Sequence, residues 1–217
     1  MYKSYFKRII DLVLSAIGII ILALPMLILS LAVKLDSPGP VLFKQKRVGI
    51  HKTYFYILKF RTMRIDTPHD VPTHMLGDPE QWITTMGKFL RRTSLDELPQ
   101  IFNIFMGHMS IIGPRPALWN QYDLIEERDH YGANDILPGL TGWAQINGRD
   151  ELEIPIKAKL DGEYTETLLA GGFKGLAMDV KCFLGTIASV LKSEGVVEGG
   201  TGELRKRETN KEETVIE

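Results

Sequence analysis

The order of apolar and polar residues separates an uncharged stretch near the start of the chain from a longer part built of shorter periodic segments. From Leu12 to Val33 the chain runs for 22 residues without a charged side chain. A helix needs about 20 apolar residues to cross a bilayer, so this stretch predicts a helix embedded in a membrane. The apolar core of a cleaved signal peptide is shorter, about 7–15 residues, and no small-x-small cleavage site follows here.

Two features of this stretch favour a helix that enters the membrane and returns to the same side. Pro25 lies inside it, where a proline removes one backbone donor and its ring clashes with the preceding turn. Basic residues flank both ends, and the positive-inside tendency would keep both ends in the cytoplasm. From the residues alone, a straight span and a re-entrant hairpin broken at Pro25 both stay open. The flanking cations are Lys3, Lys7, Arg8, Lys34, Lys44, Lys46 and Arg47.

The segments after this stretch predict a small hairpin followed mainly by helices. Ser37-Pro38-Gly39-Pro40 is a cluster of helix breakers. The β-prone runs Val41–Phe43 and Tyr54–Leu58 lie on either side of a turn, which predicts a β-hairpin or two edge strands. From Lys59 to Arg64, basic and apolar residues alternate, as in a half-buried strand with its cations on one face. Helical patterns follow at 82–92, 97–107, 116–131, 151–169 and 176–192, and an ordered glycine-rich loop is expected at 138–149.

An apolar stripe in residues 176–192 has two explanations, because it could pack in the core or lie in a membrane interface. The predicted fold class is α+β and mostly helical. We expect a membrane anchor at 1–35, a cytosolic, membrane-associated domain at 36–193 and a flexible, charged tail at 194–217. The members of the stripe are Leu176, Val180, Phe183, Leu184, Ile187, Val190 and Leu191.

The charges are unevenly distributed, although the net charge is −1. Residues 1–65 contain eleven Lys/Arg against two acids, whereas residues 66–217 contain fifteen against twenty-five. A basic region beside an apolar segment predicts an anionic partner, either lipid or phosphate. Nucleic acid is disfavoured, because the basic residues match no nucleic-acid-binding motif. The single cysteine, Cys182, excludes an internal disulfide, and its apolar neighbours favour a small buried or membrane-facing side chain over a nucleophile.

The acidic pair Asp96-Glu97 is the main candidate for chemistry, although helix capping accounts for it more simply. Ser94-x-x-Glu97 matches the capping box that starts many helices. Pro99 instead favours a helix that begins nearer Asp96, where free backbone donors bind phosphate readily. Adjacent carboxylates repel each other unless a cation compensates, and Arg91 or Mg²⁺ could do so. A carboxylate held against a phosphate can attack it covalently.

Three other clusters suit phosphate, a base or a sugar ring, although each is also explained as a rigid turn, a strand or an ordered loop. Arg115 lies between Pro114 and Pro116, which hold its backbone rigid. The loop 138–149 carries an aromatic ring and polar side chains, and Lys59 begins the alternating basic run. The sequence has no Walker loop, G-x-G-x-x-G or G-x-S-x-G, and its histidines show no zinc spacing. The polar or aromatic members of the loop are Trp143, Gln145, Asn147 and Arg149.

Taken together and in order, these clusters resemble the monotopic phosphoglycosyl transferases, also called bacterial sugar transferases, and in particular their small PglC-like branch. The similarity extends over about residues 1–192. It rests on five ordered stretches, which are Phe6–Asp11, Leu58–Met63, Ser94–Gln100, Met109–Pro116 and Pro138–Arg149.

The resemblance implies that Asp96 attacks the sugar-linked phosphate of a UDP-sugar, that UMP leaves, and that polyprenyl (undecaprenyl) phosphate then takes the enzyme-bound phosphosugar. It further implies that Glu97, together with Asp96, holds Mg²⁺. A one-step transferase that uses the pair only as a metal site, and a non-catalytic membrane adaptor, are the alternatives. The expected contacts are Lys59, Arg91 and Arg115 for phosphate, and Gln145 and Arg149 for nucleotide or sugar.

The resemblance also implies a re-entrant membrane helix broken at Pro25 and amphipathic helices in the interface. Lys7 and Arg8 would then lie at the lipid head groups on the cytoplasmic face of the bacterial inner membrane. Downstream glycosyltransferases of glycoconjugate assembly are expected partners. The family often has serine before the breaking proline, whereas this chain has Leu24. No residue selects among UDP-sugars.

Overall fold

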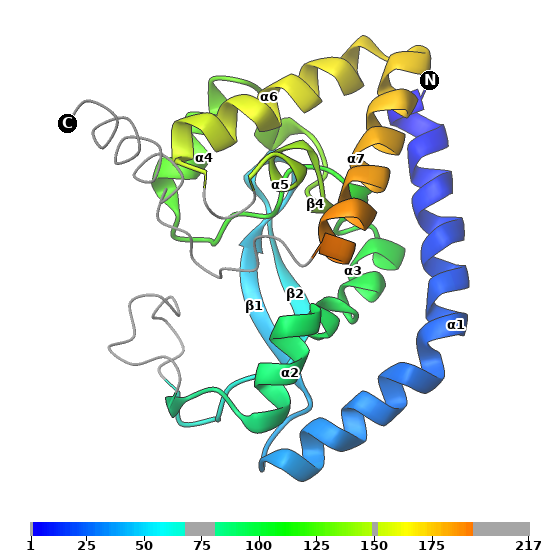
Figure 1. The fold of residues 1–217 in the computed structure, drawn as a ribbon. Helices are drawn as coiled ribbons and strands as arrows, with labels where there is room; N and C mark the ends of the chain where they lie inside the picture. The colour runs from blue at the N-terminus through cyan, green and yellow to red at the C-terminus, as the bar shows by residue number, and fades with distance from the viewer. Residues whose placement is uncertain (1, 68–80, 149–151, 193–217) are drawn as a thin grey trace, which may run out of the picture.

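The computed structural model describes residues 2–67, 81–148 and 152–192 (Figure 1). It is mostly helical and contains two small two-stranded sheets, which confirms the predicted α+β class. The short π-helix η1 (Tyr2–Phe6) leads into the long helix α1 (Lys7–Asp36), which lies along one side of the molecule in Figure 1. The predicted flexible tail at 194–217 lies outside the described residues.

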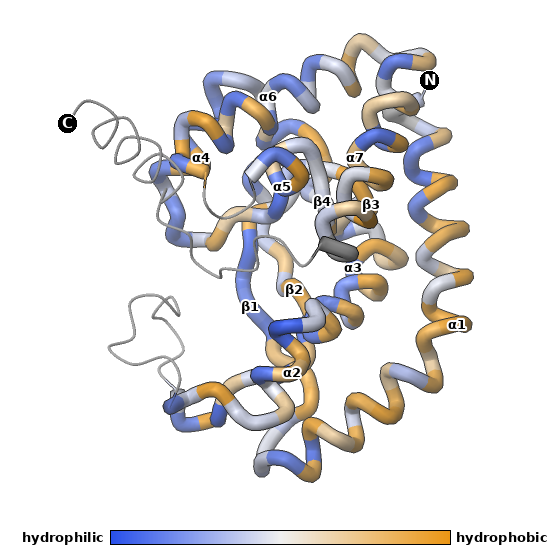
Figure 2. Tube along the Cα trace, in the orientation of Figure 1, coloured by the Kyte–Doolittle hydropathy of each residue, from blue (hydrophilic) through white to orange (hydrophobic). Residues whose placement is uncertain are grey.

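Helix α1 keeps Pro25 inside one helix of 30 residues, so the predicted break at this proline is not confirmed. A proline removes one hydrogen bond from the ladder, and the other bonds hold the two halves together. The helix does bend part-way along its length (Figure 1). Among the described residues it is the one helix long and apolar enough to cross a membrane. Its surface is apolar over most of its length (Figure 2), and Ile20 and Leu35 are each 77% exposed.

The predicted hairpin is confirmed, and its strands are longer than expected. Strand β1 (Leu42–Val48) pairs antiparallel with β2 (Tyr54–Phe60), and the 3₁₀ turn η2 (Ile50–Lys52) joins them. Alternate residues of β2 face the core, and the last of these is Lys59. A buried ammonium group is costly without a negative partner, so this register requires an acidic side chain beside Lys59.

The predicted helices are present with shifted ends, and a parallel strand pair was not predicted. Strands β3 (Ser110–Ile112) and β4 (Gly139–Thr141) pair within motifs that the sequence indicated only as a turn and a loop. Three residues per strand are too few for a periodic pattern to show. The remaining elements are α2 (Thr85–Thr93), η5 (Leu95–Glu97), α3 (Gln100–Met106), α4 (Tyr122–Asp129), η6 (Ala133–Asp135), α5 (Trp143–Ile146), α6 (Ile154–Ala170) and α7 (Gly172–Lys192).

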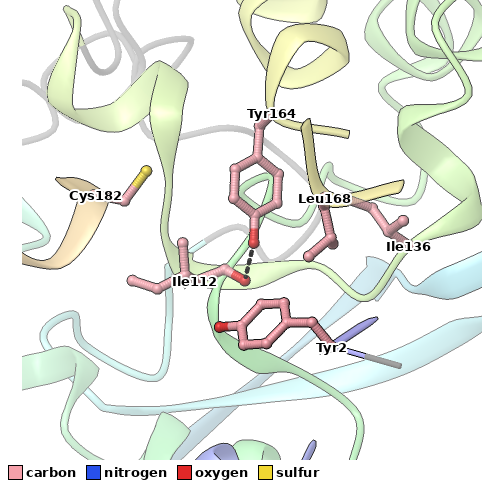
Figure 3. Packing of buried hydrophobic residues seen from close by; sticks show 6 residues of the cluster. All are labelled: Tyr2, Ile112, Ile136, Tyr164, Leu168 and Cys182. Atoms are coloured by element: carbon pink, nitrogen blue, oxygen red, sulfur yellow. Dashed lines mark hydrogen bonds between the residues drawn. The ribbon is translucent and has the colours of Figure 1, made fainter. Parts of the chain in front are cut away.

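One core cluster joins the start of the chain to its last helices. Tyr2, Ile112, Tyr164 and Cys182 pack together with Ile136 and Leu168 (Figure 3). The hydroxyl of Tyr164 lies 3.1 Å from the carbonyl oxygen of Ile112. Cys182 is fully buried, and its burial, together with the nearby charge of Asp179, raises the pKa of its thiol to about 12. The thiol is therefore a packing group, as predicted, and not a nucleophile.

Most of the apolar stripe of α7 faces outward, although its first member, Leu176, packs against the core cluster. The buried face of this helix carries Gly175, Asp179 and Cys182, at helical spacing. Core packing is therefore the wrong explanation for the exposed members of the stripe, of which Leu184 is 59% exposed. The side chains of Val190 and Leu191 lie outside the described part of the chain. The other exposed members are Val180, Phe183 and Ile187, and Phe173 extends the same surface.

Candidate active site

The acidic pair lies on a single 3₁₀ turn, η5, between helices α2 and α3. Ser94 ends α2 in the left-handed conformation with φ of 56°, and its side chain makes no capping bond. The capping-box interpretation is therefore wrong. Helix α3 begins at Gln100, after Pro99. Asp96 and Glu97 thus lie in a short, tight connection whose carboxylates are available to other elements.

Four charged side chains from three segments meet at this turn. Lys59 Nζ, from β2, lies 3.1 Å from Glu97 Oε1 and 3.9 Å from Asp96 Oδ2. Arg115, from the turn after β3, donates from Nη2 to Glu97 Oε1 at 2.5 Å and from Nη1 to Glu97 Oε2 at 3.4 Å. The Asp96 and Lys59 side chains are only 8% and 10% exposed. The structure thus brings together three sequence motifs that are far apart along the chain.

The two cations determine the ionisation of Glu97. Burial alone would raise the pKa of this carboxyl group, but the charges of Arg115 and Lys59 outweigh burial and hold its pKa well below the ordinary range. Glu97 is therefore a carboxylate at any physiological pH. Its charge holds the ammonium of Lys59 and the guanidinium of Arg115 at this turn, and the ammonium lies beside Asp96.

Glycines pack the Arg115 turn against the strand pair. Gly113 N donates to Thr141 O at 2.8 Å, and Gly139 N donates to Pro114 O at 2.8 Å. The backbones approach so closely that a Cβ on Gly139 would lie 2.1 Å from Gly113 N. A Cβ on Gly142 would likewise lie 2.2 Å from Gly113 O. The Gly113–Pro116 motif and the Pro138–Arg149 motif are therefore two halves of one packed unit.

We expect Gly139→Ala to destabilise the fold by roughly 1–3 kcal/mol or more, because the added methyl group overlaps the backbone of Gly113. Thermal unfolding followed by circular dichroism measures the effect. Gly175→Ala is the matched control, since its Cβ would meet nothing closer than a Tyr2 ring atom at 3.1 Å and the residue is helical. Equal melting temperatures for the two variants would contradict the tight packing of the turn.

The other predicted ligand-binding residues are not all placed at the acidic pair. Arg91 is oriented by its Nε, which donates to Thr62 Oγ1 at 2.9 Å. Both carboxamide atoms of Gln145 are buried without a hydrogen-bond partner in the structure. Arg149 lies outside the described residues. Trp143 donates from Nε1 to Glu163 Oε2 at 3.0 Å, and Lys181 lies 4.4 Å from the centre of its ring, so one ring face is covered.

Comparison with known proteins identifies the family. The sequence profile of the family described as "Bacterial sugar transferase" matches residues 2–193, nearly nine-tenths of the chain. The chain belongs to the bacterial sugar transferase family.

Individual relatives of this bacterial sugar transferase support the same family assignment. The UDP-glucose:undecaprenyl-phosphate glucose-1-phosphate transferase of Xanthomonas campestris pv. campestris is 44% identical over 65% of this chain and 30% of its own length. The exopolysaccharide production protein PSS of Rhizobium leguminosarum bv. phaseoli is 38% identical over 85% of this chain and 94% of its own length. The uncharacterized sugar transferase EpsL of Bacillus subtilis (strain 168) is 35% identical over 88% and 89%. The chain spans about a third of the length of several relatives named for glucose phosphate transfer.

The acidic pair of this sugar transferase offers limited but suitable ligands for Mg²⁺. Within the described ranges, no three His, Cys, Asp or Glu side chains are grouped as metal ligands. Mg²⁺ commonly uses only one or two protein carboxylates and completes its shell with water and phosphate oxygens. Glu97 Oε2 receives a single long contact, 3.4 Å from Arg115 Nη1. Glu97 Oε2 is therefore the candidate ligand for a hard cation, and Asp96, the adjacent residue, is the second candidate carboxylate.

Lys7 and Arg8 both have partners inside the protein. Lys7 is 8% exposed, and its Nζ lies 2.7 Å from Asp179 Oδ2. Arg8 donates from Nη1 and Nη2 to the carbonyl oxygens of Ile104 and Phe105, at 2.7 and 2.8 Å. A guanidinium at the last carbonyls of α3 complements the helix dipole. These residues attach α1 to α7 and α3, a task that the sequence did not indicate, and their contact with lipid head groups stays a prediction.

Proposed function

We propose that this chain transfers a sugar 1-phosphate from a UDP-sugar to polyprenyl phosphate and releases UMP. The observation that carries the proposal is the buried carboxylate of Asp96 with Lys59 at its side and with Arg115 paired to the adjacent Glu97, within a chain of the bacterial sugar transferase family. Relatives named for transfer from UDP-glucose to undecaprenyl phosphate make these two molecules the first candidate substrates.

In the first step, Asp96 Oδ attacks the phosphorus that bears the sugar. A bond forms between the carboxylate oxygen and this phosphorus, and the bond from the phosphorus to the bridging oxygen breaks. That oxygen keeps the electron pair and departs as part of UMP. Lys59 and Arg115 place two positive charges where the transferred phosphoryl group gains negative charge in the transition state.

In the second step, a phosphate oxygen of polyprenyl phosphate attacks the same phosphorus. The bond from Asp96 to the phosphosugar breaks, the carboxylate is restored and a polyprenyl diphosphosugar is formed. No external oxidant or base is needed, because over the two steps one phosphate anion, polyprenyl phosphate, replaces another, UMP, as the partner of the phosphoryl group. Burial of Asp96 keeps water from competing for the acyl phosphate.

Glu97 Oε2 and Asp96 are the residues that would hold Mg²⁺, which when bound neutralises diphosphate charge. Lys59, Asp96, Glu97 and Arg115 have a formal charge that sums to zero, so a divalent cation alone would leave the site strongly positive. We therefore propose that metal and diphosphate enter together.

We expect UDP to raise the affinity of Mn²⁺, used as a spectroscopic substitute for Mg²⁺, by at least about tenfold, as coupled ligands typically do. Electron paramagnetic resonance titrations with and without UDP measure protein-bound metal. Glu97→Gln serves as the control and should lose most of the coupling. Tight Mn²⁺ binding that is equal with and without nucleotide would contradict the charge argument.

The membrane arrangement is part of the proposal. The exposed apolar surfaces of α1, α3 and α7 would face lipid, and Phe105 and Met106 on α3 are 43% and 53% exposed. Helix α1, bent and flanked by cations, would be re-entrant with both ends at the cytoplasmic face of the inner membrane. This placement would bring Asp96 close to the head-group level, where a soluble UDP-sugar and a lipid phosphate can both reach it.

Release of UMP on incubation with separate UDP-sugars, undecaprenyl phosphate and Mg²⁺ tests the function. We expect release with at least one UDP-sugar, and UDP-glucose is the first to try. Initial rates should follow ping-pong kinetics, since UMP leaves before the lipid reacts. Ternary-complex kinetics would favour a one-step transfer, and saturable UDP-sugar binding without turnover would favour a non-catalytic adaptor.

A further inference from the structure

Each of the five consecutive residues 113–117 in the Arg115 turn has a backbone group that is hydrogen-bonded to another part of the fold. Two of these hydrogen bonds are made with strand β4, as described above, and three are made with other elements. The turn is largely buried, and buried backbone groups need hydrogen-bond partners within the fold. The three further donors are Arg128 to Arg115 O, Arg47 to Pro116 O and Val48 N to Ala117 O, each at 3.0 Å.

The anchor on Arg115 itself comes from a buried ion pair between α4 and α6. Arg128 donates from Nε and Nη2 to Asp161 Oδ2, at 2.9 and 2.6 Å. The side chains of the two residues are 4% and 1% exposed. The same Nη2 also donates to Arg115 O. One rigid guanidinium thus connects a buried carboxylate to the peptide that carries the arginine of the acidic pair.

Fold stability alone does not require this arrangement. Removing two charges from water is costly, and replacing a buried ion pair by neutral residues is often neutral or stabilising. A guanidinium has a planar, fixed set of donors, and this geometry suits the simultaneous contacts with Asp161 and Arg115. The ion pair therefore has a task that a neutral pair of residues could not perform.

We propose that Arg128, held in place by Asp161, is a positioning residue for the transfer reaction. It fixes the Arg115 peptide and thereby directs the Arg115 guanidinium toward Glu97 and the transferred phosphate. This inference rests on the proposed function for its effect on rate, but its effect on the Arg115 guanidinium can be measured without turnover. Arg128 acts through Arg115 and needs no contact with substrate.

Two variants separate positioning from packing. Arg128→Gln with Asp161→Asn removes both charges and the reach to Arg115 O, and leaves no unpaired buried charge. Arg128→Lys keeps the ion pair but loses the planar donor set. The matched control, Lys52→Gln with Asp129→Asn, removes an exposed pair between η2 and the residue that follows Arg128 on α4, and its side chains are 54% and 42% exposed. The control should keep the wild-type rate and stability, because exposed ion pairs contribute little.

We expect both Arg128 variants to fold with melting temperatures within a few degrees of wild type, while kcat for UMP release falls on the order of 10- to 100-fold. ¹H–¹⁵N NMR of the Arg115 guanidinium, with its signal assigned by Arg115→Lys, gives a second readout. In wild type the two contacts with Glu97 should hold the guanidinium rigidly and slow the exchange of its protons with water. In the Arg128 variants this exchange should be faster, because the Arg115 peptide is no longer held.

Wild-type kcat together with a wild-type Arg115 guanidinium signal, in whichever Arg128 variant folds, would overturn the proposal. If the doubly substituted protein does not fold, Arg128→Lys decides alone. If wild type itself releases no UMP, the proposed function fails, and the Arg115 signal still decides whether Arg128 positions Arg115.

Discussion

Asp96→Asn should abolish UMP release, with a loss on the order of 10⁴-fold or more, as expected when a nucleophile is removed. An amide oxygen cannot form the acyl phosphate, because it carries no negative charge and attacks phosphorus poorly. The asparagine side chain has nearly the same shape as the aspartate, and Lys59 Nζ lies as far as 3.9 Å from the carboxylate. The melting temperature should therefore stay close to wild type, so the lost rate cannot be explained by unfolding.

The matched control is Asp66→Asn, a substitution of the same chemistry at a surface site. Asp66 pairs with Arg64 at 2.8 Å, and its side chain is 52% exposed. This variant should keep the wild-type rate. Substantial UMP release by a folded Asp96→Asn protein, confirmed free of deamidated protein by mass spectrometry, would show that the covalent mechanism is wrong.

Lys59→Met should lower kcat/KM by roughly 10²- to 10³-fold, the usual cost of removing a preorganised positive group from a phosphoryl-transfer site. It should also reduce the free energy of unfolding by roughly 1.5–3 kcal/mol, since a charged hydrogen-bonding group is lost beside Glu97. UMP release and thermal unfolding measure the two effects. Lys44→Met, at an exposed position on the same hairpin, is the control and should change neither.

The pH dependence of the Lys59 variant has a definite sign. In wild type, Lys59 and Arg115 lower the pKa of Glu97, so the stabilisation from its charge is complete above the ordinary carboxyl pKa and is lost progressively as the pH falls from there toward the lowered pKa of the folded state. Without Lys59 the pKa of Glu97 rises toward its ordinary value. The acid-side decline of activity should therefore begin at a higher pH than in wild type, and the stability lost on acidification should become smaller. A pH profile identical to that of wild type would mean that Lys59 does not control Glu97.

The sequence predicted the parts of the site whose signals are local. The hairpin followed from its β-prone runs, and Lys59, Asp96, Glu97 and Arg115 were identified by the motifs that contain them. The spacing of these four residues in the sequence could not predict that their side chains lie together, because this depends on the strand register that turns Lys59 inward. It also depends on the glycine contacts that join the Arg115 turn to β4.

Other functional residues carried no recognisable signal. Arg128 and Asp161 lie 33 residues apart on helices whose polar residues resemble any solvated face. Ser94-x-x-Glu97 matched a capping box, yet the structure ends α2 at Ser94 instead, because the chain turns sharply there into η5. Lys7 and Arg8 looked like membrane-flanking cations, and only the tertiary fold pairs them with Asp179 and the end of α3.

The covalent phosphosugar on Asp96 is the central claim, and intact-protein mass spectrometry tests it most directly. Wild type is incubated with Mg²⁺ and the UDP-sugar that supports turnover, while polyprenyl phosphate is withheld. The account predicts a mass increase of one phosphosugar, located at Asp96 after proteolysis, removed by adding polyprenyl phosphate and missing in Asp96→Asn. A fully active preparation that carries no adduct under these conditions, or carries it on another residue, would contradict the account.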